Sequence, residues 1–211
     1  ALLSSEKDNT DKIVRYIEEC KRLGIPVLPP LVNESYAVFT CVENTIRFGL
    51  SAVKNVGTTA VASILSTREA KGPFRSLYDF CERVDLRLCN RKVLESLIKC
   101  GAFDDFGLKR AELMSLLAHV LEVGSKVQYD RQRGQLSLLD SLDDCSASPR
   151  TISGTGDIPE WSEHQRLSYE REVLGFYVSA HPLAKFEHVL KTYATSTTVS
   201  VVQAPSDAQT L

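Results

Sequence analysis

The sequence predicts a mainly α-helical protein that also contains a small β-hairpin, a flexible linker and a short C-terminal α/β segment. Apolar residues recur at helical spacing through most of residues 49–129. Two β-prone runs flank residues 43–44, and residues 140–160 are rich in Ser, Asp, Gly and Pro without apolar periodicity. We therefore expect four parts: residues 1–48, a helical domain over 49–133, a linker over 134–160 and a final segment over 161–211.

The N-terminal part begins with an amphipathic helix. Thr10 can cap this helix, and Gly24 is placed to end it. The apolar positions expected to face the core are Ile13, Ile17, Cys20 and Leu23.

An extended passage and the β-hairpin follow. Three prolines, at positions 26, 29 and 30, each fix φ and restrict the preceding residue, so no helix can continue there. Residues 37–42 and 45–48 predict two strands joined across Glu43 and Asn44.

Beyond the linker, residues 161–174 resume a helical pattern, which His181 and Pro182 break. Residues 186–190 predict another short helix, and residues 197–203 predict a single strand.

Cysteine and histidine usage argues against a metal centre. The six cysteines form no C-x-x-C pair, and the four histidines have neither H-x-x-x-H nor H-E-x-x-H spacing. Scattered free cysteines fit a reducing compartment. The first residues do not show the pattern of a leader, and no run approaches a membrane span, so we expect a cytoplasmic location. The start at Ala1 and the single methionine, Met114, indicate a chain cut from a longer protein.

Charge is unevenly distributed along a chain whose net charge is −2. Residues 47–110 carry twelve Lys and Arg against seven Asp and Glu, whereas residues 134–175 carry three against eight. A basic middle is compatible with a module that faces phosphates, although two ordinary solvated surfaces would give the same counts.

Residues 50–65 resemble a helix-hairpin-helix unit, in which two apolar helices flank the turn Lys54-Asn55-Val56-Gly57. Such a turn, with the positive end of the second helix, presents backbone N–H groups to a phosphate. An ordinary pair of packed helices is the alternative.

Each residue type suits that unit. Gly57 would allow a close approach and an unusual φ, and Val56 would anchor the turn to the core. Ala60 and Ile64 would let the helices pack, while Thr58 or Thr59 would cap the second one. Asn55 stands where the common pattern has a first glycine, and asparagine tolerates the left-handed conformation.

A second unit of the same kind follows. Residues 93–104 combine a helix with a turn at Gly101 and Ala102, and a new helix starts at Leu108. Tandem helix-hairpin-helix units would contact phosphates along one duplex without reading its sequence. The cations expected to support DNA binding are Lys54, Arg68, Lys71, Lys99, Lys109 and Arg110.

Five stretches carry a family resemblance: KDNTDKIVRYIEECKRLGI, VLPP, IRFGLSAVKNVG, GPFRSLYDFC and VLESLIKCGAFD. They resemble the end of the fingers and the helix-hairpin-helix region of the bacterial DNA polymerase III alpha subunit. EREVLGFYVSAHPL resembles the segment that leads into that family's OB-fold. The resemblance implies part of a DNA-directed DNA polymerase, with duplex DNA and the remainder of the polymerase as partners. Leu31 departs from the acidic residue that usually follows the two prolines.

Nucleotide transfer in that family requires palm carboxylates that hold two Mg²⁺ ions. The close acidic pairs here are Glu18-Glu19, Asp104-Asp105 and Asp143-Asp144. Neighbours on a helix point about 100° apart, so such pairs are poor metal clamps. We expect no catalytic residue, metal site or cofactor in this chain, with Mg²⁺ in the missing palm domain.

Gln135, Leu136, Ser137, Leu138 and Leu139 resemble the family's internal sliding-clamp-binding peptide, which usually ends in Phe. Gln135 would be a polar anchor, and each leucine would contribute about 1.5–3 kcal/mol before ordering costs. The alternative is that these leucines close the preceding helix onto its own core.

Two other functions stay open. The same hairpins would serve a stand-alone DNA repair or recombination module, or a protein-interaction scaffold in which they only pack helices.

Overall fold

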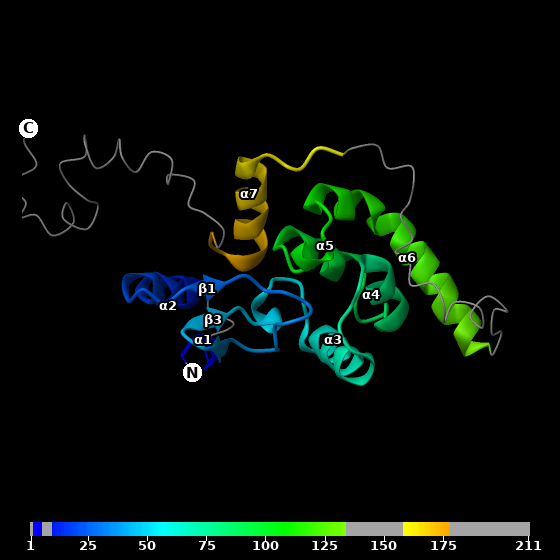
Figure 1. The fold of residues 1–211 in the computed structure, drawn as a ribbon, viewed down its shortest axis with the longest axis horizontal. Coiled ribbons are helices and arrows are strands. Elements are labelled where there is room, and N and C mark those ends of the chain that lie inside the picture. The colour runs from blue at the N-terminus through cyan, green and yellow to red at the C-terminus, as the bar shows by residue number, and fades with distance from the viewer. Residues whose placement is uncertain (1, 6–9, 134–157, 178–211) are drawn as a thin grey trace, which may run out of the picture. The chain divides into compact units, whose positions relative to one another are not determined.

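The computed structural model describes residues 2–5, 10–133 and 158–177. All the described residues belong to one compact unit. The helices in Figure 1 are α1 (Leu2–Ser5), α2 (Thr10–Arg22), α3 (Thr58–Lys71), α4 (Leu77–Arg83), α5 (Arg91–Lys99), α6 (Arg110–Gln132) and α7 (Glu163–Leu174). The 3₁₀ turns are η1 (Leu50–Ala52) and η2 (Asp104–Phe106), and the strands are β1 (Val27–Leu28), β2 (Thr40–Val42) and β3 (Thr45–Arg47).

Helix α2 forms where the sequence predicts it, with Ile13 and Ile17 only 3% and 2% exposed. Gly24 ends the helix as predicted, whereas the position of Leu23 differs from the prediction. Gly24 adopts φ +70, and the N–H of Ile25 bonds back to Cys20, so the chain turns off the helix axis after Arg22. Leu23, expected on the buried face, is therefore 59% exposed.

The predicted β-hairpin is confirmed, with shorter strands. Strands β2 and β3 pair antiparallel, Val42 lies opposite Thr45, and Glu43 in the turn adopts φ +51. The sequence did not predict β1, which lies between Pro26 and Pro29 and pairs in parallel with β3. The sheet order is therefore β1-β3-β2.

A mainly helical fold is confirmed, and its core lies where α4 and α5 pack against α6. Phe80 and Phe103 are fully buried at its centre, with ring centroids 5.1 Å apart. The prediction of an apolar helix directly before Lys54 is wrong, because residues 50–52 form only the single 3₁₀ turn η1.

Helix α7 packs against α5, as Figure 1 shows. Ser162 caps its start, and its end residues Val173 and Leu174 are buried. The ring centroids of Phe176 and Phe48 lie 5.6 Å apart. Residues 158–177, which the sequence assigned to the linker end and the final segment, thus lie against the helical domain. The predicted domain boundaries themselves stay a prediction.

The segments 134–157 and 178–211 lie outside the described residues. They contain the predicted clamp peptide, most of the predicted linker, the short helix over 186–190 and the strand over 197–203. Within the part of the chain that the structure describes, no helix is both long and apolar enough to cross a membrane.

Candidate functional site

The first predicted turn, hairpin 1 (residues 54–57), is anchored by the core, α5 and α7, while the start of the helix that follows it is exposed. Val56 is 5% exposed and anchors it in the core. Asn55 adopts φ +66, and its side-chain amide donates to Ser96 Oγ at 3.1 Å on α5. The backbone N–H of Lys54 donates to the carbonyl of Val173 at 2.8 Å, while the Lys54 side chain is exposed.

The start of α3 follows hairpin 1 directly, and it lacks a side-chain acceptor. Gly57 occupies the N-cap position, and Thr58 and Thr59 are the exposed first residues of the helix. No side chain among the described residues caps α3, and its first turn has no acidic residue. Its N–H groups and the positive end of its dipole are therefore available to an external anion.

The structure corrects two details of hairpin 1. Gly57 has φ −71, so the left-handed residue of the turn is Asn55. Thr58 and Thr59 do not cap α3, because the helix has already begun at Thr58 and the cap position belongs to Gly57.

Hairpin 2 (residues 100–103) faces inward. Ala102 and Phe103 are fully buried; the N–H of Ala102 donates to the carbonyl of Leu97, and its carbonyl accepts from the N–H of Val32. Gly101 adopts φ +80, and a Cβ atom there would overlap the Arg110 guanidinium and the Asp104 carboxylate. The glycine of hairpin 2 thus makes room for an arginine.

Arg110 is buried among carboxylates. Its guanidinium side chain is 6% exposed and pairs with Asp104 at 2.6 Å and with Glu170 of α7 at 2.9 Å. Burial lowers the pKa of Arg110, but the hydrogen bonds and charge of Asp104 and Glu170 raise it further, so the net shift is upward. This arrangement fastens α7 to the start of α6.

A carboxylate also occupies the N-terminus of α6. Glu160 accepts from the backbone N–H groups of Arg110 at 2.9 Å and Ala111 at 3.2 Å, and from Trp161 at 2.8 Å. Burial raises the pKa of Glu160, but the three backbone donors outweigh that effect and leave it below its usual value. Glu160 therefore stands where a phosphate would bind in a second helix-hairpin-helix unit.

The other predicted DNA-binding cations differ in their surroundings. Lys99 pairs with Glu172 at 2.7 Å, and Lys109 donates to the carbonyl of Ile158 at 3.2 Å. Arg68 donates to two backbone carbonyls, each at 2.8 Å, and lies over the Tyr36 ring. Lys71 is exposed and lines a hollow of about 270 Å³ with Pro73, Arg75, Asp79 and Arg83. None of these contacts tests DNA binding directly, so these roles stay predictions.

The acidic pairs among the described residues do not form a metal site. Glu19 is bound by Arg22, and Asp104 by Arg110. Burial raises the pKa of Asp105, which accepts from Asn33. The described residues hold no group of three or more His, Cys, Asp or Glu suited to a metal ion, and Asp143-Asp144 lies outside them. These residues therefore do not fit the Mg²⁺ pair of a polymerase palm.

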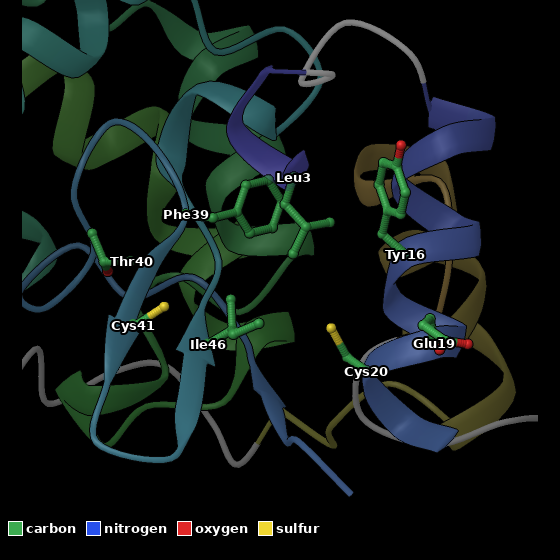
Figure 2. A pocket seen from close by; sticks show the side chains of 8 residues that line it. All are labelled: Leu3, Tyr16, Glu19, Cys20, Phe39, Thr40, Cys41 and Ile46. Carbon is green, nitrogen blue, oxygen red and sulfur yellow. The ribbon is translucent and has the colours of Figure 1, made fainter. Parts of the chain in front are cut away.

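A separate pocket of about 320 Å³ lies between α2 and the β-hairpin (Figure 2). Its lining residues are Leu3, Tyr16, Glu19, Cys20, Phe39, Thr40, Cys41 and Ile46. Burial, with the nearby charge of Glu19, raises the pKa of the Cys20 thiol. With no cation in its lining, this pocket does not suit a phosphate.

Comparison with known proteins gives the family. A helix-hairpin-helix motif model matches residues 24–113. The DNA polymerase III subunit alpha of Saccharopolyspora erythraea is 47% identical over 200 residues, covering 92% of this chain and 16% of that protein. The Mycobacterium tuberculosis subunit is 40% identical over 212 residues, covering 99% and 18%. The Thermus aquaticus subunit is 43% identical over 186 residues, covering 88% and 14%.

The chain belongs to the DNA polymerase III alpha subunit family. It spans about one sixth of the length of the curated relatives it matches. The resemblance inferred from the sequence is thereby confirmed.

Sequence reasoning missed the residues that hold this alpha-subunit segment together. Ser96, Glu160 and Glu170 lie 41, 50 and 60 positions from their respective partners Asn55, Arg110 and Arg110. No local pattern marks such pairs. A buried position for Glu170 could have been suspected only from its place between the apolar residues Leu167 and Val173.

Alanine should change the stability of the chain to different extents at the two hairpin glycines. Gly57→Ala should change the free energy of unfolding by less than about 1 kcal/mol, because Gly57 has negative φ and an added Cβ meets only Thr59 Oγ1 at 3.9 Å. Gly101→Ala should cost more than about 2 kcal/mol, because it combines positive φ with overlap on the Arg110 cluster. Urea unfolding measures both, and equal losses would contradict the assigned geometry.

Proposed function

We propose that this chain holds duplex DNA, without sequence preference, for a bacterial replicative DNA polymerase. Nucleotide transfer would belong to other parts of the polymerase, so the chain alone would extend no primer. The remainder of the polymerase would be its partner, and the free thiols suit a cytoplasmic location.

One observation carries the proposal: hairpin 1 is rigidly held, yet the start of α3 is open. Among α3 to α7, only α3 has no side-chain acceptor at its N-terminus from the described part of the chain. Lys54 adds an exposed cation beside it. Backbone N–H groups, a helix dipole and a lysine together suit a phosphate oxygen, and they read no base.

Hairpin 2 does not support a second phosphate contact. Its phosphate position is filled by Glu160, and Arg110 is committed to Asp104 and Glu170. For this hairpin the packing role of a scaffold is favoured. We therefore assign the principal DNA contact to hairpin 1.

We also propose that Gln135–Leu139 binds a sliding clamp. This segment lies outside the described residues, and the support is its sequence: a glutamine followed by spaced leucines, between the basic helical region and the acidic linker. A peptide in that position could reach a groove on a clamp while hairpin 1 stays on DNA.

Binding of duplex DNA should depend on salt and on Lys54. The logarithm of affinity should fall with the logarithm of salt at about −0.9 per phosphate contacted. Lys54→Ala should make this slope shallower by about one unit, as measured by fluorescence anisotropy on two duplexes of unrelated sequence.

Lys126→Ala is the matched control, since Lys126 is an exposed lysine on the C-terminal half of α6. It should leave the slope unchanged. Equal slopes for the wild-type chain and Lys54→Ala would place the contact surface elsewhere.

Clamp binding should be modest, with a dissociation constant on the order of micromolar, because Leu139 fills less of a pocket that accepts an aromatic ring than Phe would. Leu139→Phe should tighten binding to the cognate clamp, and Gln135→Ala with Leu138→Ala should abolish it. Calorimetry measures both.

The double change should leave duplex affinity and helix content intact. If it instead melts the chain, the leucines belong to the core and the clamp assignment is wrong.

A further inference from the structure

The loop that leads into α5 is attached to the first turns of α3. The backbone N–H of Asp85 donates to Ser63 Oγ at 3.2 Å, and Cys89 Sγ lies 3.8 Å from the carbonyl oxygen of Ala60. Further along, Asn55 of hairpin 1 is bonded to Ser96 in the middle of α5. Helix α5 therefore begins beside the open end of α3 and runs past hairpin 1.

The first turn of α5 has the wrong charge for a helix start. Helices α4, α6 and α7 each carry an acidic residue in that turn, as expected from the helix dipole. Helix α5 has none, and its first two residues are Arg91 and Lys92. Cations at the positive end of a helix are unfavourable, unless an anion lies against them.

Lys92 is available for such an anion. It is exposed and has no hydrogen-bond or ion-pair partner among the residues that the structure describes. Arg91 pairs with Glu95 at 2.7 Å, but its side chain is 66% exposed. The capping of α5 by Asn90 means that the contact would come from these side chains, not from the backbone of the helix start.

The spacing suits one duplex. Lys92 lies three positions after Cys89, which touches α3, and a step of three positions spans at most about 11 Å. Measured along the axis of a duplex, that length corresponds to roughly three phosphates of one strand. A strand seated on hairpin 1 would therefore pass within reach of Lys92.

We propose that Lys92, supported by Arg91, is a second contact to the phosphate backbone of the duplex held by hairpin 1. This inference rests on the proposed function. It replaces hairpin 2 as the source of the second contact, because two adjacent N-terminal turns, of α3 and α5, both lack the acidic residue that would repel a phosphate.

Charge reversal at Lys92 gives opposite effects on binding and stability. Lys92→Glu should weaken duplex affinity at low salt by threefold or more, and reduce the drop in affinity between 50 and 200 mM salt by about threefold. Without DNA it should raise the melting temperature, because a carboxylate suits the helix start. A lysine with a purely structural role would not give both results.

Lys126→Glu on α6 is the control and should not weaken duplex binding. Lys92→Gln, which removes the charge without adding another, should weaken binding less than Lys92→Glu does. If Lys54→Ala weakens binding and neither Lys92 variant does, the inference is wrong and the role of hairpin 1 stands. If the Lys54 and Lys92 variants all bind as the wild-type chain does, both contacts are wrong and the contact surface lies elsewhere. If the wild-type chain itself binds no duplex DNA, the proposed function is wrong.

Discussion

The buried guanidinium of Arg110 connects four elements of this structure. Arg110 is the first residue of α6, and its guanidinium donates to Asp104 beside hairpin 2, to the Lys99 carbonyl at the end of α5 and to Glu170 on α7. A buried charge needs such partners, and removal of one costs about 3 to 5 kcal/mol. The position of α7 on the helical domain depends on this cluster, and α7 in turn supplies the carbonyl of Val173 that holds hairpin 1.

The two hairpins have therefore diverged in what they do. Hairpin 2 uses its glycine, its cations and the start of the following helix for internal carboxylates. Hairpin 1 has the same kinds of group, but the helix that follows it starts without a side-chain acceptor among the described residues. Its hydrogen bonds to α5 and α7 hold the turn in place. A rigid turn with unfilled donors pays less ordering entropy on binding, which suits a site that must hold a passing backbone.

Local signals allowed much of the fold to be predicted. Helix α2, the β-hairpin and the long helical region followed from periodicity, and the left-handed Asn55 from its residue type. Strand β1 was missed because its pairing with β3 is set by a partner 19 positions away, as in Val27 opposite Ile46. The expected first helix of residues 50–53 shrank to a 3₁₀ turn, because Val53 leaves the helical conformation at φ −79 and ψ 127.

The candidate site was predictable in part, for a similar reason. Lys54 and the start of α3 could be found from the motif. The pairing of Lys99 and Arg110 with carboxylates of α7 could not be predicted, because Glu172 and Glu170 are 73 and 60 positions away from them. Counting cations in a basic region cannot separate those that are paired internally from those that face a ligand.

The most direct test of this account is a titration of the isotope-labelled chain with a short duplex, followed through its backbone amide resonances. The amides of Thr58, Thr59 and Ala60 should shift most, while those of Arg110 and Ala111 stay on Glu160 and change little. The largest shifts at Arg110 and Ala111, with none at the start of α3, would contradict the central claim that hairpin 1 holds the DNA.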